Sequence, residues 1–297
     1  MVSERADRRI DVTLSKGHRT LLPMEPGEMA RGPRIGLGRT AEVYAWGDHE
    51  ILKLYLANMP PEWVYHEARI GHIVAEAGLH APAIGDTVEV GGRLGILYER
   101  IDGPSMLDAL AHQPWRLFRL ARQFALVHAT MHDCVRPELP SQRQSLIRAI
   151  VHAPRLDDMV RHRALAVLDQ MPEGESVCHG DYHPGNIILS PRGPIVIDWM
   201  TACHGNAGAD VARTVLLFRI GVLPEGTPLA QRVMTQLLRR AFLSAYLRAY
   251  RALRPLSEAV IEAWLPILAA ARLSERIDAE EARLLSLARS TGWHKVG

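Results

Sequence analysis

The sequence predicts an α+β fold with two lobes. We expect a small antiparallel β lobe with one helix over residues 1–101 and a larger, mainly helical lobe over residues 102–297. Three observations predict it. Short β patterns separated by glycine turns fill most of the first region, and apolar residues recur at three- and four-residue steps after residue 104. The segment Asp102-Gly103-Pro104 that joins the two regions is too short to be an independent linker.

The β lobe begins with strands and tight turns. The polar residues 1–30 suggest a strand or two. Residues 35–46 are typical of a glycine-rich turn that runs into a β segment, and residues 51–56 form the next strand. Gly47-Asp48 between them is a turn signal, so the two strands are expected to form a hairpin.

One helix and two more strands complete this lobe. Pro60-Pro61 favours a helix start, because proline is tolerated in the first helical turn. The helix is expected over about 62–77 and ends at Gly78, a common terminator. Short β segments follow at 87–90 and 93–100.

Helical patterns dominate the second lobe. Another helical region is expected over about 142–170, short strand and loop pieces over 176–189 and 194–199, and helices from residue 210 to the end. One apolar stripe at helical spacing predicts a buried helix face: Leu117, Leu120, Phe124, Val127 and Met131.

The composition excludes several classes of protein. Of the 297 residues, 47% are apolar and 23% are charged, which is typical of a globular protein and not of a disordered one. Thirty-five Lys and Arg against 33 Asp and Glu leave a net charge of +2. This is too balanced for a protein that coats nucleic acid, so no nucleic-acid partner is expected.

Cysteine use and hydropathy indicate a cytoplasmic protein with no membrane partner. The 3 cysteines are odd in number and widely spaced, which argues against a disulfide framework and fits a reducing cytosol. The N-terminus is charged from residue 4 on, unlike a signal peptide. No apolar run is long enough to span a bilayer.

The most informative stretch is Cys-His-Gly-Asp-Tyr-His-Pro-Gly-Asn at 178–186, followed by Ile-Asp-Trp at 197–199. Asp181 and Asn186 share one loop, and Asp198 lies at the far end of a β-hairpin, so three oxygen-bearing side chains can point into one cleft. Hard oxygen ligands suit Mg²⁺, which completes its shell with phosphate and water. With one acid and the amide on the metal, the other acid is free to accept a hydroxyl proton, as phosphoryl transfer requires.

The pattern His-x-Asp-x4-Asn followed by Ile-Asp-Trp resembles the catalytic and metal-binding loops of the aminoglycoside phosphotransferase family, a branch of the protein-kinase-like fold. The resemblance covers roughly residues 30–275. It implies that Asp181 is the catalytic base and that Asn186 and Asp198 hold Mg²⁺. It also places His183 where a phosphate contact is plausible.

Neighbouring residues add to the resemblance and also depart from it. His179 is expected to brace the loop. Asp210 stands at a helix start, where it can cap the helix, and the resemblance implies that it supports the catalytic loop. The family often has an acidic residue after Ile-Asp-Trp, but here Met200 and Thr201 follow, so a second metal ion is in doubt.

Gly36-x-Gly38-x-x-Ala41-x-Val43 is similar to the glycine-rich loop that covers the phosphates of ATP, with Ala41 in place of the third glycine. Glycines let backbone N–H groups approach phosphate oxygens. A dinucleotide-binding fingerprint is the rival interpretation, but that motif needs a helix directly after the glycines. Because a strand pattern follows here, the kinase-type hairpin is favoured.

Lys53 is a charge within the apolar strand Ile51-Leu52-Lys53-Leu54. It is either a solubilising lysine on an edge strand or, by the resemblance, the lysine that grips the α- and β-phosphates. The second role needs a carboxylate partner. Glu67 is the preferred candidate, with Glu62 and Glu76 as alternatives.

Tyr98-Glu99-Arg100-Ile101 resembles the hinge between kinase lobes, where backbone groups read the adenine edge. By this resemblance the Glu99 carbonyl and the Ile101 amide contact adenine. Ile35, Val43 and Ile188 are expected to line the adenine pocket, and ordinary core positions are the alternative.

Histidines raise the possibility of zinc. His179, Asp181 and His183 at alternate positions can ligate zinc in a hydrolase, but the Pro-Gly-Asn that follows and the later Ile-Asp-Trp argue against it. His128 and His132 are four residues apart on a helix, as in a zinc pair. No Glu stands between them, so helix packing is favoured.

The predicted function is transfer of the γ-phosphoryl group of ATP, or of GTP, to a hydroxyl of a small molecule such as an aminoglycoside, an amino alcohol or a sugar. A non-catalytic nucleotide-binding regulator is disfavoured because Lys53 and the acids are all present. A protein kinase is disfavoured because residues 198–210 leave little room for an activation loop. The charges of the C-terminal region are mixed, so the acceptor stays open, and both monomer and homodimer stay possible.

Overall fold

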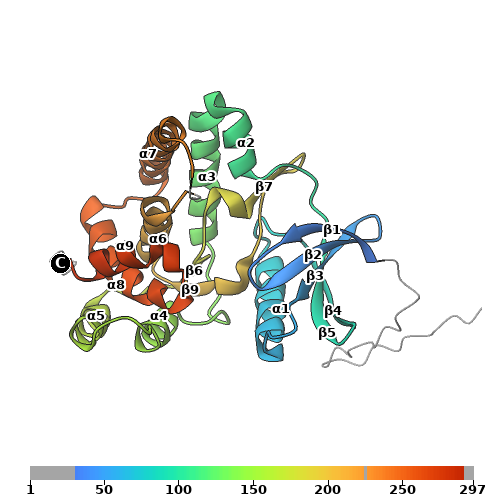
Figure 1. The fold of residues 1–297 in the computed structure, drawn as a ribbon, viewed down its shortest axis with the longest axis horizontal. Helices are drawn as coiled ribbons and strands as arrows, with labels where there is room; N and C mark the ends of the chain where they lie inside the picture. Colours follow the sequence, from blue (N-terminus) through green and yellow to red (C-terminus); the bar gives the residue numbers. More distant parts are fainter. Residues whose placement is uncertain (1–30, 224–225, 291–297) are drawn as a thin grey trace, which may run out of the picture.

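The computed structural model describes residues 31–223 and 226–290. An antiparallel sheet with one helix stands beside a mainly helical part (Figure 1). The α+β prediction is therefore confirmed. The strand or two expected within residues 1–30 lie outside the described residues.

The elements follow the chain in this order. The strands are β1 (Arg31–Leu37), β2 (Ala41–Trp46), β3 (Glu50–Tyr55), β4 (Ile84–Val90), β5 (Arg93–Glu99), β6 (Ser176–Cys178), β7 (Ile187–Ser190), β8 (Gly193–Val196) and β9 (Cys203–Gly205). The α-helices are α1 (Pro61–Glu76), α2 (Met106–His112), α3 (Leu117–His132), α4 (Gln142–Val151), α5 (Asp158–Gln170), α6 (Ala207–Ile220), α7 (Leu229–Leu253), α8 (Glu258–Arg272) and α9 (Asp278–Ala288). Short 3₁₀ turns cover Pro114–Arg116 (η1), Pro184–Asn186 (η2), Trp199–Thr201 (η3) and Leu273–Glu275 (η4).

The N-terminal sheet has the strand order β1-β2-β3-β5-β4, and every pair is antiparallel. Because β3 is the central strand, Lys53 is not an edge-strand lysine. Side chains alternate along β3, as a pleated strand requires. Leu52 and Leu54 pack with Tyr44 and Trp46 on one face, while Tyr55 belongs to a separate apolar cluster on the other.

The sequence predicted a glycine-rich turn that runs into a β segment; the structure has a strand on both sides of the turn, β1 and β2. Gly36 lies within β1, opposite Val43 of β2. The turn itself begins at Gly38, whose N–H donates to the Ala41 carbonyl at 2.8 Å. The segment still forms the hairpin predicted in place of a dinucleotide-binding loop.

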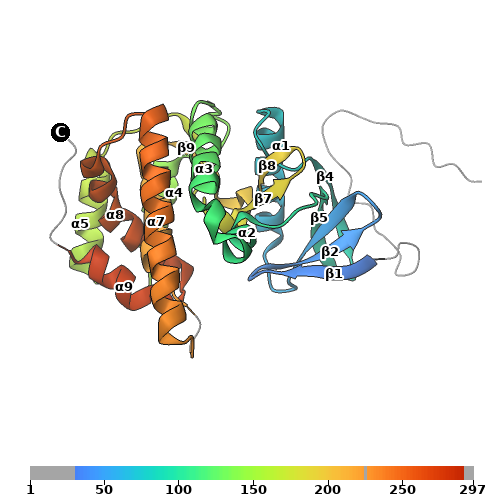
Figure 2. The same ribbon diagram turned by 90° about the horizontal axis from the view of Figure 1, so that it is seen from above.

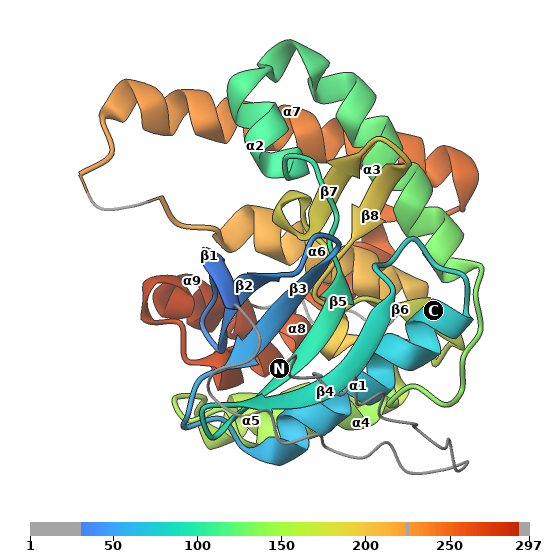
Figure 3. The same ribbon diagram turned by 90° about the vertical axis from the view of Figure 1, so that its right-hand side faces the viewer.

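Helix α1 packs beside the sheet (Figure 3). Its Val64 joins the apolar cluster of Ala41, Tyr55 and Ile96. This packing buries Glu67 and leaves Glu62 and Glu76 exposed.

The helical part has one continuous core. The predicted apolar stripe of α3 is buried throughout. Helices α3 and α7 run side by side over this face (Figure 2). The single helical region expected over 142–170 is instead two helices, α4 and α5. Asp157 caps α5 by accepting from the Val160 N–H at 2.9 Å, and Pro154 lies in the break between the two helices, where it cannot disturb either.

Two short ladders hold the segments that matter most for the site. Strand β6 pairs with β9, and β7 pairs with β8. The loop 179–186 is therefore fixed at both ends, and Asp198 lies between β8 and β9. In the described part of the chain, no helix is long and apolar enough to cross a bilayer.

Candidate active site

A cleft of about 1800 Å³ opens between the sheet and the helical part. Both parts of the molecule line it. All the residues predicted to bind nucleotide or metal, or to act as base, border this one cleft: Gly36, Gly38, Val43, Lys53, Glu67, Glu99, Ile101, Asp181, His183, Asn186, Ile188 and Asp198. Ile35 lines it as well.

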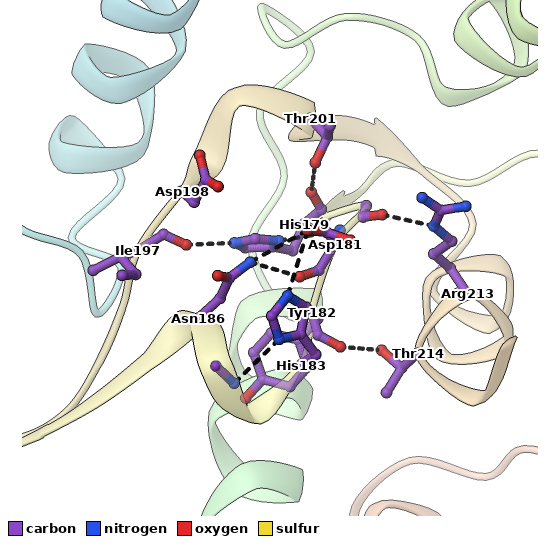
Figure 4. A network of polar contacts seen from close by, with 12 residues as sticks. His179, Asp181, Tyr182, His183, Asn186, Ile197, Asp198, Thr201, Arg213 and Thr214 are labelled. Carbon is purple, nitrogen blue, oxygen red and sulfur yellow. Dashed lines mark hydrogen bonds and ion pairs between the residues drawn. The ribbon is translucent and has the colours of Figure 1, made fainter. Parts of the chain in front are cut away.

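Asp181 lies in the loop between β6 and η2 (Figure 4). Its Oδ2 is 3.5 Å from His183 Nε2 and accepts from Asn186 Nδ2 at 3.4 Å. Burial alone would raise the pKa of Asp181. The hydrogen bond from His183 and the charge of Arg213 outweigh burial and hold the pKa below its usual range. The carboxylate is therefore ionised at neutral pH and can accept a hydrogen bond from a hydroxyl group.

His179 braces this loop from inside the core. Its Nε2 donates to the Ile197 carbonyl at 3.1 Å, so its Nδ1 is free to accept from the Asp181 N–H at 3.2 Å. The ring packs against Trp199, with 4.8 Å between ring centres. One buried imidazole thus connects the loop of Asp181 to the segment that carries Asp198, so it cannot serve as a zinc ligand without breaking one of these bonds.

Asn186 and Asp198 fit a divalent cation. Asn186 Nδ2 donates to the Asp181 carbonyl at 3.0 Å, which leaves the amide oxygen as the group turned to the cleft. The Asn186 carbonyl accepts from the Ile197 N–H at 2.9 Å, and this bond brings Asp198 beside it. Within the described residues, neither Asn186 Oδ1 nor Asp198 Oδ2 has a hydrogen-bond donor. A carboxylate and an amide oxygen are the hard ligands that Mg²⁺ prefers.

Lys53 joins the two sides of the cleft. Its Nζ is 2.7 Å from Glu67 Oε1 and 2.9 Å from Asp198 Oδ1. Tyr55 and Tyr98 also donate to the Glu67 carboxylate. Burial lowers the pKa of Lys53, but the two carboxylates more than compensate, so the net shift is upward. Glu67 is therefore the carboxylate partner that the sequence favoured.

The hinge segment and His183 are held by further contacts. Glu99 Oε1 accepts from Arg192 at 2.5 Å, and the Glu99 N–H donates to the Ala83 carbonyl at 2.8 Å. His183 Nδ1 accepts from the Gly185 N–H at 3.1 Å and so begins the η2 turn. These contacts fix the backbone near the Ile101 amide and turn the other His183 nitrogen toward Asp181.

Asp210 holds the catalytic loop from the core. Its Oδ2 accepts from the His179 N–H at 2.8 Å, and its Oδ1 from the Gly180 N–H at 2.9 Å. The prediction that Asp210 caps its helix is wrong, because Asn206 caps α6 by accepting from the Gly208 and Ala209 amides. Asp210 lies one turn further on, where its side chain points to the loop.

His128 and His132 lie behind Asp210. Their Nε2 atoms are 3.1 and 3.2 Å from Asp210 Oδ2, and their Nδ1 atoms are 2.8 and 2.7 Å from the hydroxyls of Tyr246 and Tyr250. These histidines and Asp210 are also close enough to hold a metal ion together. Their nitrogens, however, already bond to the carboxylate and the tyrosines, and burial lowers the pKa of His128 to about 3, so its ring is neutral. The histidines therefore pack and hydrogen-bond, as predicted.

Sequence reasoning missed Arg213 and Thr201. Arg213 Nε donates to the Gly180 carbonyl at 3.0 Å, and Thr201 Oγ1 donates to the His179 carbonyl at 2.8 Å. The available signal for Arg213 was its position three residues after Asp210, which puts both on one helix face. Thr201, noted only as a departure from the family pattern, is a structural support for the loop.

We expect Gly180→Ala to destabilise the protein more than Gly91→Ala does. Both glycines have positive φ, +78° and +59°, so both substitutions cost about 1–2 kcal/mol of backbone energy. A Cβ on Gly180 would also lie 2.8 Å from the Thr201 carbonyl oxygen, whereas nothing lies within 4 Å at Gly91. Denaturant unfolding of the two variants measures the difference. Equal losses of unfolding free energy would contradict the close contact at Gly180.

The comparisons with known proteins agree with this geometry. The model of the phosphotransferase enzyme family matches residues 32–258. A comparison with curated proteins finds no match.

Solved structures share the fold at low identity. An aminoglycoside-3'-phosphotransferase of type VIII is 18% identical, covers 85% of this chain and 94% of its own, and has a TM-score of 0.54. An amicoumacin kinase in complex with AMP-PNP, Ca²⁺ and its ligand is 15% identical, with 91% and 89% covered and a TM-score of 0.54. A choline/ethanolamine kinase family protein from Mesorhizobium loti is 15% identical, with 90% and 91% covered and a TM-score of 0.52. These similarities confirm the predicted protein-kinase-like class.

Proposed function

The chain belongs to the phosphotransferase enzyme family and is a small-molecule phosphotransferase, and from this premise we propose that it moves the γ-phosphoryl group of ATP, with Mg²⁺, to a hydroxyl of a small molecule. The observation that carries the proposal is the meeting of Asp181, Asn186, Asp198 and Lys53 at one cleft. ATP is the proposed donor, with GTP as the alternative. Solved neighbours with AMP-PNP and with ADP support a nucleotide in this position.

In the proposed reaction Asp181 orients the acceptor hydroxyl and accepts its proton. The acceptor oxygen forms a bond to the γ-phosphorus, while the bond from that phosphorus to the bridging oxygen of the nucleotide breaks. Lys53 neutralises charge on the phosphates, and His183 contacts the transferring group. Positioning and fixed charge supply most of the rate gain, because the protein itself forms no covalent bond.

Asn186 and Asp198 would hold the magnesium ion, which supplies charge neutralisation at the phosphate oxygens when bound. The ion would compete with Lys53 for the Asp198 carboxylate. Backbone N–H groups near Gly36 and Gly38 would cover the phosphates, and Val43 and Ile188 would face adenine. Glu99 and Ile101 would contact the adenine edge through the main chain. We also propose the lobe boundary between residues 101 and 102, at the end of this hinge.

A screen for ADP release tests the proposal. Hydroxylated metabolites and aminoglycosides are supplied with ATP and Mg²⁺, and the Asp181→Asn variant is the blank. Acceptor-dependent ADP release by the wild-type chain alone is the expected result. Release that is equal in both chains would count against the role of Asp181.

We expect Glu67→Gln to lower kcat/KM for the nucleotide by on the order of 10²-fold, because displacement of Lys53 disturbs the alignment of the reacting groups. Glutamine keeps one acceptor oxygen for one tyrosine and can donate from its amide nitrogen to the other, but it loses the charge that holds Lys53. The matched control is Glu62→Gln on the same helix, at an exposed position. Steady-state kinetics against nucleotide concentration measures both, and equal values for the two variants would exclude the Lys53–Glu67 pair from nucleotide binding.

A further inference from the structure

The end of the cleft next to Asp181 is unusually rich in arginine. Glu275 is a lining carboxylate here, and three guanidinium groups surround it. Arg213 binds its Oε1, Arg272 lies 3.0 Å from its Oε2, and Arg39 of the glycine-rich hairpin approaches to 3.8 Å. The charge of Glu275 is therefore fully balanced by the protein itself.

Arg213 places this cluster beside the reacting centre. The same guanidinium that binds Glu275 also donates to the carbonyl of Gly180, the residue before Asp181. Arg213 alone thus links Glu275 to the catalytic loop. Arg272 is engaged a second time by Glu280, at 2.6 Å, and this bond keeps it in the core of the cluster.

Arg276 is the arginine of this region that has no such partner. It lines the cleft and is exposed, and no ion pair or hydrogen bond from its side chain occurs among residues 31–223 and 226–290. Its backbone is left-handed, with φ +54°. Asp198 is the other non-glycine residue with positive φ in the described chain, and it lines the same cleft. Such backbone strain concentrates at functional positions.

The cluster has an excess of positive charge. Arg39, Arg213 and Arg272 pair with Glu275 and Glu280, and the charge of Arg213 also acts on Asp181, so three arginines stand against three carboxylates and Arg276 is the positive charge in excess. Elsewhere in the cleft, Asp102 pairs with Arg100 at 3.0 Å. Among the described residues, Asp181 has only the imidazole of His183 within ion-pair distance, and Glu62 has no cation. A polycation needs free carboxylates, and at the arginine-rich end of the cleft Glu275 is already bound by guanidinium groups.

We propose that the acceptor carries an anionic group, a carboxylate or a phosphate, and that Arg276 binds this group, with Arg39 beside it. The inference rests on the proposed function and narrows it to hydroxylated anions. A guanidinium suits this task because its N–H groups match two oxygens of a carboxylate or phosphate at once. Polycationic acceptors, by the same argument, are repelled.

The test measures how small molecules bind in the part of the cleft next to Asp181 and Arg276 while a nucleotide analogue occupies the proposed nucleotide site. The full chain is saturated with AMP-PNP and Mg²⁺, so that anions cannot bind in place of the triphosphate. Calorimetry then compares one carbon skeleton with different charge: sorbitol, gluconate, 6-phosphogluconate and glucosamine. Inorganic phosphate is included as an anion without a carbon skeleton, and neomycin is included as a polycation.

We expect the phosphate- and carboxylate-bearing probes to bind at least about ten-fold more tightly than sorbitol, a difference of about 1.4 kcal/mol. Arg276→Gly keeps the left-handed backbone and removes the charge, and it should abolish this preference. Arg276→Lys should retain part of it. Arg240→Ala, at an exposed position of α7 outside the cleft, is the control and should leave it unchanged.

The proposal is overturned if no anion binds, if glucosamine or neomycin binds more tightly than the anions, or if Arg276→Gly binds them as the wild type does. These outcomes are separate from failure of the proposed function. ADP release that depends on Asp181 but occurs with a polycation would leave the phosphotransfer reaction intact and reject the anionic acceptor. Anion binding through Arg276 without any Asp181-dependent ADP release would reject the reaction instead.

Discussion

Asp181→Asn should lower turnover by on the order of 10²–10⁴, with the fold and nucleotide binding retained. Asparagine has nearly the same shape, but its amide cannot take the hydroxyl proton. Lys53, which would hold the nucleotide phosphates, bonds to Glu67 and to Asp198 without any contribution from Asp181. The measurements are kcat from ADP release and the Kd of AMP-PNP from calorimetry.

The matched control is Asp102→Asn, the same exchange at an exposed aspartate of the same cleft. Asp102 pairs with Arg100 at the surface, so its loss should change kcat little. Wild-type turnover in Asp181→Asn, or an equal loss in both variants, would remove Asp181 from the reaction.

Asp210→Ala should cost on the order of 2–6 kcal/mol of unfolding free energy, a large part of what a protein of this size has. The substitution leaves the buried N–H of His179 and the partly buried N–H of Gly180 without an acceptor, at about 1–3 kcal/mol each. The donors on His128 and His132 lose their acceptor as well. Denaturant unfolding followed by circular dichroism measures the loss.

Asp157→Ala is the control for this prediction. Asp157 caps the N-terminus of α5 at the surface, and loss of such a cap costs about 1 kcal/mol. A loss in Asp210→Ala no larger than in Asp157→Ala would mean that the loop amides find other acceptors. Asp210→Asn keeps one acceptor oxygen and should fall between the two.

The sequence predicted best those features that are encoded locally. Residues 178–186 form one loop, so the spacing of Asp181 and Asn186 already places them side by side. The strand pattern around Lys53 and the helix that follows it bring Lys53 and Glu67 together within 14 residues. These short separations are the reason that spacing alone placed the members of these two pairs together, whereas the contact of Lys53 with Asp198 spans 145 residues and was expected only from the resemblance.

Contacts between distant segments were not predictable in the same way. Tyr246 and Tyr250 approach His128 and His132 across 118 residues of chain, and nothing in the local pattern of either helix specifies that contact. The prediction of Asp210 as helix cap failed for a related reason, since Asn206 holds that position. Both residue types favour the cap position, and only the three-dimensional position of the catalytic loop draws Asp210 away from it.

The split of the region 142–170 has a local cause and a tertiary one. Pro154 and the cap residue Asp157 mark the break within the sequence, and Arg161 also donates to the carbonyls of Ile150 and Val151 at the end of α4. A side chain from the next helix thus satisfies the end of the previous one. A prediction that uses only neighbouring residues in the sequence cannot detect such tertiary capping.

The paired tyrosines of α7 have an evolutionary consequence. Two parallel chains of hydroxyl, imidazole and carboxylate converge on a single aspartate, so either chain can hold it when the other is lost. Loss of one hydroxyl, as in Tyr246→Phe, should thus cost less than half of what loss of both hydroxyls costs, a form of epistasis that a double-mutant cycle detects. Such redundancy would let the outer helix drift in sequence while the loop it supports stays in place.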